Sequence, residues 1–341
     1  MKLLITGGGG FVGARLARAL LARGTLAGEK ITSLVLTDIA PPPADLLADA
    51  RVSARTGPLL AQTQALLNRD GGESFDGVFH LASAVSGECE ADFDLGLRSN
   101  LDSTRALLDA LRANVNAGGK VPRVVFSSSV AVFGPDPALP LPPVVADDTI
   151  PAPQTSYGTH KLICEHLVAD YTRKGYIDGR SARLMTVTVR PGRPNGAASS
   201  FFSGIIREPL AGVEAVCPVS ADVSHPLSSP ARTVDGLIAV FEASRERIVG
   251  RSALNLPALN VRVSEMLAAL EQVAGKKVRE RVRFERDERI AGIVANWPSG
   301  ASAKRAAGLG LHPHDNFADI IRQYIDDCAK LPNAGEALKG L

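Results

Sequence analysis

A tyrosine and a lysine stand four residues apart in the stretch Ser156–Lys161, which reads Ser-Tyr-Gly-Thr-His-Lys. If this stretch opens a helix, Tyr157 and Lys161 lie on one face, because residues at i and i+4 are neighbours about 5–6 Å apart at Cβ. A tyrosine titrates near pH ~10, and a nearby cation favours its ionised form. The resulting phenolate would take a proton from an alcohol. The same spacing is common by chance on a solvated helix face, so the pair needs support from the rest of the chain.

Three serines, Ser127–Ser129, follow the apolar run Val124–Phe126, which we expect to form a strand. Hydroxyl groups at the carboxyl end of a parallel strand face the ligand crevice of an open α/β sheet. Simple capping of the strand end is the alternative interpretation.

Glycines recur every third residue near the start of the chain, at Gly7, Gly10 and Gly13, between a short apolar run and a helical pattern. In that context glycine allows a tight turn and a close approach to a pyrophosphate at the helix N-terminus, although a plain flexible loop is the alternative. Asp38 ends the next predicted strand, 25 residues after Gly13. A carboxylate there would accept both ribose hydroxyls and repel a 2′-phosphate, which favours NAD over NADP. A helix cap or turn residue is the other interpretation of Asp38.

Segments typical of strands and helices alternate through the first half of the chain, and these segments must position the residues above. The expected strands include 33–37, 52–56, 75–80, 124–126 and 184–189, and the expected helices include 97–115 and 157–174. Such alternation predicts an α/β fold with a Rossmann-type doubly wound parallel sheet. The segment 135–153 contains seven prolines and is expected to be a long loop beside the site.

The periodicity weakens after about residue 190, which indicates a smaller, discontinuous α/β substrate domain. We expect an NAD-binding Rossmann domain over 1–190 and 231–257, and a substrate-binding domain over 191–230 and 258–341.

The composition of the 341 residues, 45% hydrophobic and 22% charged, is that of an ordinary globular protein. The formal net charge of +2 includes no basic run, so neither a nucleic acid nor a membrane surface is the expected partner, and a small molecule is favoured. The four cysteines form no Cys-x-x-Cys motif, so we expect no metal site and no small disulfide framework. A cytoplasmic location is the default. No apolar run reaches 18 residues, so no transmembrane helix is expected.

Together these motifs resemble the extended short-chain dehydrogenases/reductases of the NAD-dependent epimerase/dehydratase type. The resemblance covers roughly residues 1–195. It rests on the order and spacing of the glycine motif, Asp38, His80–Ser83, Ser127–Ser129 and the Tyr157/Lys161 pair.

This resemblance implies that Ser129, Tyr157 and Lys161 are catalytic, with Tyr157 as the general base, and that Pro191 lies beside the nicotinamide. It also implies an NAD site formed by Gly7, Gly10, Phe11, Val12, Gly13, Asp38, Leu81, Ala82, Ser83, Asn100, Tyr157, Lys161 and Pro191.

The chain departs from parts of the family pattern. Val130 and Ala131 stand where the family's nucleotide-sugar dehydratases carry an Asp-Glu pair, so no acid is placed to assist loss of water. The segments Arg190–Gly196 and Phe201–Leu210 look like the D-erythronate dehydrogenase branch, whose members oxidise C2 of a four-carbon sugar acid with NAD. The resemblance further implies a homodimer formed through the helices near 97–115 and 157–174.

A planar guanidinium matches a carboxylate with two parallel hydrogen bonds. Arg193 and Arg232 are therefore candidate substrate-binding residues beside Ser129 and Tyr157, with an internal acid as the alternative partner of each arginine.

Three functions stay open. The first is an NAD-dependent dehydrogenase of a small 2-hydroxy sugar acid, and the second is a nucleotide-sugar epimerase that keeps NAD tightly bound. Release of NADH separates these two. The third is an NAD-binding regulatory protein without chemistry, against which the intact Ser129, Tyr157 and Lys161 argue.

Overall fold

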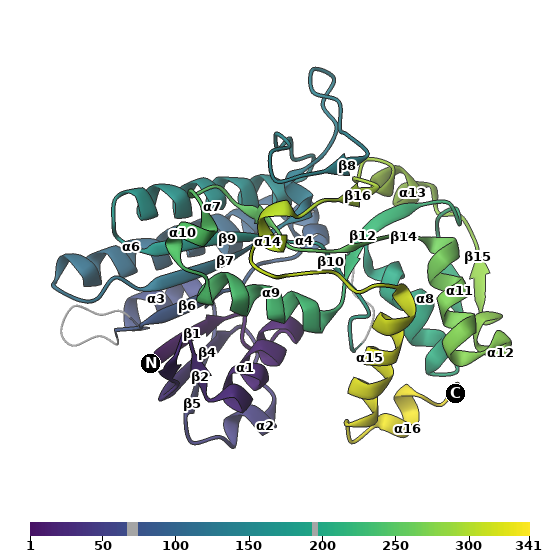
Figure 1. The fold of residues 1–341 in the computed structure, drawn as a ribbon, viewed down its shortest axis with the longest axis horizontal. Helices are drawn as coiled ribbons and strands as arrows, with labels where there is room; N and C mark the ends of the chain where they lie inside the picture. Colours follow the sequence, from purple (N-terminus) through teal and green to yellow (C-terminus); the bar gives the residue numbers. More distant parts are fainter. Residues whose placement is uncertain (67–73, 193–196) are drawn as a thin grey trace.

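The computed structural model describes residues 1–66, 74–192 and 197–341 (Figure 1). Its centre is a seven-stranded sheet in the order β5-β4-β1-β6-β7-β9-β13, and every neighbouring pair in it is parallel. The order runs outward in both directions from β1, so the predicted doubly wound Rossmann-type fold is confirmed. The strands are β1 (Lys2–Thr6), β4 (Ser33–Asp38), β5 (Val52–Thr56), β6 (Gly77–His80), β7 (Arg123–Ser129), β9 (Asp178–Leu184) and β13 (Leu254–Asn255).

Helices cover both faces of this sheet because each turns one apolar stripe inward. On one face, α1 (Phe11–Arg23) and α9 (Pro230–Glu242) pack with the strands in a shared apolar cluster. On the other face, α6 (Ser103–Asn116) and α7 (Ser156–Arg173) do the same, and α3 (Leu59–Leu66) lies against α6. The sheet is therefore buried on both sides, as its long apolar strands require.

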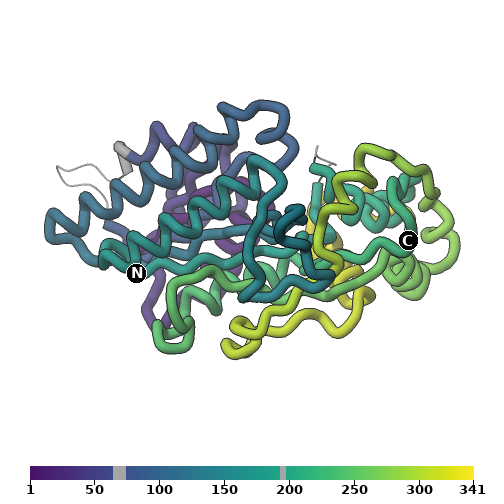
Figure 2. Tube along the Cα trace, turned by 90° about the horizontal axis from the view of Figure 1, so that it is seen from above, coloured from purple at the N-terminus to yellow at the C-terminus, as the bar shows by residue number. Residues whose placement is uncertain are grey.

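A second apolar core lies beyond the carboxyl ends of the strands, at one end of the molecule (Figure 2). It is built from α8 (Ser200–Leu210), α11 (Val263–Ala274) and α15 (Phe317–Ala329). Two small sheets accompany these helices. One has the order β10-β12-β14 and the other pairs β11 with β15. Their strands are β10 (Thr186–Val187), β12 (Ser224–Ser228), β14 (Leu259–Arg262), β11 (Ala215–Cys217) and β15 (Val282–Phe284).

Three segments differ from the sequence-based expectation. The strand expected over 184–189 spans Asp178–Leu184 as β9, and Thr186–Val187 form β10 in a different sheet because the chain leaves the central sheet after Leu184. The expected helix over 97–115 begins as a π-helical turn, η1 (Leu97–Asp102), in which the Ser103 N–H donates to the carbonyl of Arg98, five residues back. The proline-rich loop contains a short strand, β8 (Val144–Val145), because it pairs in parallel with β16 (Gly300–Ala301), far along the chain. A partner so distant in sequence leaves no local signal.

The remaining elements are short and connect the main ones. They are β2 (Thr25–Leu26), β3 (Glu29–Lys30), α2 (Ala44–Leu47), α4 (Ser86–Ala91), α5 (Phe93–Gly96), η2 (Val130–Val132), α10 (Arg245–Ile248), α12 (Lys276–Arg279), α13 (Glu288–Val294), α14 (Lys304–Ala307) and α16 (Ala334–Ala337). In the described parts of the chain, none of the helices has the length and apolarity needed to cross a membrane.

Candidate active site

A cavity of about 1730 Å³ opens at the carboxyl ends of β1, β4, β6 and β7 and extends to the second core. Parallel sheets of this topology bind ligands at this edge, where the strand order reverses. Twelve of the residues predicted from the sequence line the cavity: Gly7, Gly10, Phe11, Val12, Gly13, Asp38, Leu81, Ala82, Ser83, Ser129, Tyr157 and Lys161.

The glycine loop between β1 and α1 is closed by contacts that only glycine permits. Gly7 has a φ of +74°, and a Cβ there would lie 2.8 Å from the Ala82 nitrogen. A Cβ on Gly13 would lie 2.0 Å from the Gly7 carbonyl oxygen. Because both positions exclude a side chain, the loop turns tightly and the N-terminus of α1 faces the cavity, which is the shape a dinucleotide pyrophosphate fits.

Asp38 lies at the end of β4, beside this loop. Its Oδ2 accepts hydrogen bonds from the backbone N–H groups of Gly9 at 2.9 Å and Gly10 at 3.1 Å. The carboxylate is thereby fixed at the rim of the cavity. A fixed carboxylate in this place suits the ribose hydroxyls of NAD and disfavours a 2′-phosphate. The glycine loop and Asp38 together fit the dinucleotide.

The first turn of α7 brings Tyr157 to Ser129. Thr155 caps the helix, and its hydroxyl accepts from the Gly158 N–H at 3.0 Å. Gly158 packs so tightly against the segment after β7 that a Cβ would lie 2.1 Å from the Ala131 carbonyl oxygen. The partly buried Tyr157 therefore faces the same part of the cavity as Ser129, whose hydroxyl accepts from the Ala131 N–H at 3.1 Å.

Lys161 lies one turn further along α7. Its Nζ donates to the Ser127 carbonyl at 2.8 Å and is 5.5 Å from the centre of the Tyr157 ring. The side chain is buried, and burial lowers the pKa of the Lys161 ammonium to about 8. The two groups share one helix face, as the four-residue spacing predicts.

Burial raises the pKa of the Tyr157 phenol above its ordinary value. Two groups act in the opposite direction: the side chain of Ser129, as a hydrogen-bond partner, and the positive charge of Arg190. Arg190 also lines the cavity. No motif in the sequence marked Arg190 as a site residue, although it stands in the loop that carries Pro191 and Arg193.

Three of the predicted residues that the structure describes do not line the cavity. Asn100 is buried behind it, where its side chain binds the backbone of Ala84 and the hydroxyl of Ser83. Pro191 and Arg232 are exposed and do not contribute to the cavity wall. Arg193 lies outside the described residues.

One cavity thus brings together the glycine loop, Asp38, and Ser129 beside Tyr157, the groups that a dinucleotide site joined to an acid-base site needs. Residues 3–225 match the model of the NAD dependent epimerase/dehydratase family. The chain belongs to this family.

Two relatives are similar over almost their whole length. One is a D-erythronate dehydrogenase of Cupriavidus necator, 48% identical, with 96% of this chain and 98% of the relative covered. The other is a D-erythronate dehydrogenase of Haemophilus influenzae, 43% identical, with 96% and 99% covered.

A solved structure, described as the nucleoside-diphosphate-sugar epimerase from Agrobacterium tumefaciens, is 42% identical. It superposes with a TM-score of 0.89, covering 96% of this chain and 94% of that one. With its family and these relatives, the protein is an NAD-dependent oxidoreductase.

Proposed function

We propose that this protein is a dehydrogenase that uses NAD to oxidise the C2 hydroxyl of a small sugar acid, D-erythronate, to the 2-oxo-tetronate. The observation that carries the proposal is the meeting of Ser129, Tyr157 and Lys161 in one cavity with the glycine loop. The names of the two relatives, each nearly full length, support the choice of substrate.

In the proposed reaction, Ser129 holds the C2 hydroxyl and the Tyr157 phenolate takes its proton. The C2–H bond breaks as the C2=O bond forms. NAD, when bound, supplies the hydride acceptor. Lys161 keeps positive charge beneath the phenolate, since its Nζ is held near the ring by the Ser127 carbonyl. Arg193 and Arg232 remain proposed ligands of the substrate, although Arg232 lies outside the cavity wall.

The residues after Ser129 favour oxidation over loss of water. Val130 is buried, and the backbone N–H of Ala131 donates a hydrogen bond to the Ser129 hydroxyl. Neither residue offers an acid to protonate a leaving hydroxyl. A dehydration would need such an acid beside the reacting carbon.

The roles of the cofactor-binding residues belong to the same proposal. Gly7, Gly10, Phe11, Val12 and Gly13 would hold the pyrophosphate at the start of α1. Asp38 would bind the adenosine ribose, and Leu81, Ala82, Ser83 and Lys161 would surround the rest of the dinucleotide. Asn100 would act from behind by holding Ser83 and Ala84, and Pro191 stays outside this wall.

The direct test is formation of NADH, followed by absorbance, with D-erythronate, other tetronates and UDP-sugars. We expect NADH from D-erythronate and none from UDP-sugars. Conversion of a UDP-sugar to its epimer without NADH release, and no turnover of any sugar acid, would replace the proposal with the nucleotide-sugar epimerase. NAD binding without turnover of either class would favour a regulatory protein.

We also propose two features of organisation. The chain would divide into an NAD-binding domain, 1–190 with 231–257, and a substrate domain, 191–230 with 258–341, with the cavity between them. It would form a cytoplasmic homodimer through η1, α6 and α7, where Ile163 is exposed on α7 and Phe93 is exposed on the adjoining α5. Sedimentation at micromolar concentration tests the dimer, and a monomer would contradict it.

A further inference from the structure

Arg190 carries its charge into the cavity without a carboxylate partner among the described residues. Its Nε donates to the Val187 carbonyl at 2.9 Å and its Nη2 to the Ser199 hydroxyl at 3.0 Å. Both acceptors are neutral. Buried or half-buried charges in proteins are normally paired, because removing an ion from water costs several kcal/mol.

The neighbouring Arg207 shows the contrast. It lines the same cavity, but its Nη2 donates to the Glu208 carboxylate at 2.5 Å, while its Nη1 donates to the Arg190 carbonyl at 2.9 Å. The charge of Arg207 is thus neutralised within α8, and the charge of Arg190 is not. Among the described residues, the charge of Arg190 meets only the Tyr157 phenol, which leaves the guanidinium open to an anionic ligand.

Arg190 is also held in place before any ligand arrives. Its backbone N–H donates to the Ser203 hydroxyl at 3.0 Å, and its carbonyl accepts from Arg207, both from α8. The guanidinium is tied on two further sides by Val187 and Ser199. A group fixed in this way binds its partner with little loss of conformational entropy.

The position of Arg190 matches one particular anion. Its charge acts on the Tyr157 phenol, so the two groups lie at the same end of the cavity. In a 2-hydroxy acid, the carboxylate is bonded to the carbon that bears the hydroxyl. When that hydroxyl meets Tyr157 and Ser129, the carboxylate is necessarily close to whatever cation stands beside them.

We propose that Arg190 binds the carboxylate of the substrate and makes the enzyme select 2-hydroxy acids over uncharged polyols and amides. This inference rests on the proposed function, since it names the residue that would recognise the acid group of that substrate. It differs from the sequence-based candidates Arg193 and Arg232. A guanidinium suits the role because it matches a carboxylate with two parallel hydrogen bonds.

The test compares D-erythronate with D-erythronamide, which keeps the C2 hydroxyl and lacks the charge. Wild type, Arg190→Gln, Arg190→Lys, Arg232→Gln and the surface control Arg286→Gln are assayed for NADH formation with saturating NAD. In Arg190→Gln we expect the acid-to-amide ratio of kcat/KM to fall about 10²-fold, with Arg190→Lys between it and wild type. The NAD affinity in every variant and the ratio in Arg286→Gln should stay unchanged, and Arg232→Gln shows whether the competing candidate contributes.

One alternative is that Arg190 acts only by lowering the pKa of Tyr157. In that case Arg190→Gln would slow the acid and the amide equally and shift both pH profiles upward, and an unchanged ratio would overturn the proposal. A ratio that falls in Arg232→Gln and not in Arg190→Gln would also overturn it.

A binding measurement keeps the two proposals distinct. Calorimetry follows D-erythronate and its amide binding to the NADH complex of wild type and Arg190→Gln. Tighter binding of the acid that is lost in Arg190→Gln supports the carboxylate site even if no sugar acid is oxidised, which would refute only the proposed function. Equal affinity for acid and amide in wild type refutes the carboxylate site.

Discussion

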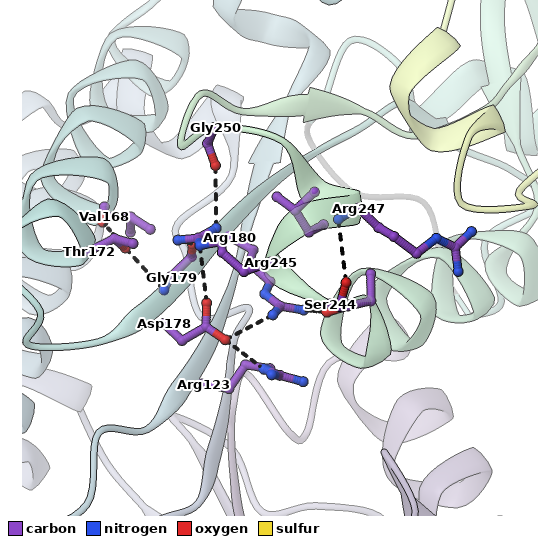
Figure 3. Close-up of polar contacts among 12 residues, drawn as sticks. Arg123, Val168, Thr172, Asp178, Gly179, Arg180, Ser244, Arg245, Arg247 and Gly250 are labelled. Carbon is purple, nitrogen blue, oxygen red and sulfur yellow. Dashed lines mark hydrogen bonds and ion pairs between the residues drawn. The ribbon is translucent and has the colours of Figure 1, made fainter.

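The two ends of strands β7 and β9 use positive charge in opposite ways. At the amino ends, Arg123 and Asp178 are the first residues of the two strands and Arg180 follows close behind. Asp178 accepts from Arg123 and Arg180 at 2.8 Å each, and Arg245 lies 3.6 Å away (Figure 3). At the carboxyl ends, Ser129, Lys161 and Arg190 line the cavity.

The amino-end cluster joins the sheet to the end of α9. Arg180 Nη1 donates to the carbonyls of Val240, Phe241 and Ala243 at 2.6 to 2.7 Å. The first two carbonyls belong to the last turn of α9 and the third to its C-cap residue, where a cation also complements the helix dipole. The side chain of Arg180 is fully buried, and burial lowers its pKa to about 10. Three arginines share the Asp178 carboxylate, and the carbonyls at the end of α9 accept from Arg180, so the role of this cluster is to hold the fold.

The carboxyl-end cations lack such partners. The Nζ of Lys161 binds a neutral carbonyl, and Arg190 makes no ion pair with a carboxylate of the described chain. The difference teaches that a buried cation in this fold stabilises the protein where a carboxylate meets it, and serves a ligand where none does. Five predictions test this contrast.

The largest expected effect is on catalysis at the carboxyl end. Tyr157→Phe removes the phenol and should lower kcat by about 10²- to 10⁴-fold, as is typical for a general base. The KM for NAD and the urea midpoint should change little, because the ring remains in place. Activity within threefold of wild type would mean that Tyr157 only packs.

At the amino end, the loss should be in stability. Asp178→Ala leaves Arg180 buried without its counter-charge and should lower the free energy of unfolding by about 3 kcal/mol, with kcat nearly unchanged. Urea unfolding measures this. The control is Asp170→Ala, which breaks the exposed Asp170/Arg173 pair and should cost under about 0.5 kcal/mol.

The same cluster predicts a pH dependence. Burial raises the pKa of Asp178, but the charges of Arg180 and Arg123 outweigh it and hold this pKa below its ordinary value. The stabilisation is therefore complete above the unfolded pKa of about 3.9 and is lost as the pH falls through the lower, folded pKa. The free energy of unfolding of Asp178→Ala should change less with pH than that of wild type over this range. Equal slopes for the two proteins would speak against the ion cluster.

Removing a cation at each end should have opposite effects on stability. Burial lowers the pKa of Lys161 from 10.5 to about 8 and outweighs the opposing charge of Glu165, so desolvating the Lys161 ammonium lowers the free energy of unfolding. Lys161→Met should thus be more stable at pH 7 by up to about 3 kcal/mol, yet lose most activity. Arg180→Met should be less stable than wild type, because the three carbonyls at the end of α9 lose their donor and Asp178 loses an ion pair.

The difference in free energy of unfolding between Lys161→Met and wild type should depend on pH. It should shrink as the pH rises from about 8 to about 10.4, because over this range the folded lysine is already neutral and the unfolded one loses its charge. A Lys161→Met protein that is less stable than wild type at pH 7 would break the comparison.

The smallest effect is expected at the rim of the cavity. Asp38→Asn keeps an acceptor for Gly9 and Gly10 but removes the charge, so the preference for NAD over NADP, as a ratio of kcat/KM, should fall about 10-fold. Wild-type enzyme that prefers NADP would contradict the assignment of Asp38.

Local sequence determined much of this protein. The glycine spacing fixes the turn before α1, since side chains at Gly7 or Gly13 would collide with backbone. The alternation of strand and helix patterns fixes the doubly wound sheet, and the i, i+4 spacing places Tyr157 and Lys161 on one face. These features depend on residues close in sequence, which is why a single sequence predicts them.

The tertiary structure alone decided the rest. The sequence offers no reason to prefer Arg190, Arg193 or Arg232 as a ligand of the substrate. The packing of α8 on the segment after β10 places Arg190 in the cavity wall, whereas Arg232 faces solvent. Likewise, only contacts across more than 60 residues show that Arg180 is paired with the end of α9. Whether a charge has a partner depends on residues remote in the chain, and for these arginines that partner separates a structural residue from a candidate ligand of the substrate.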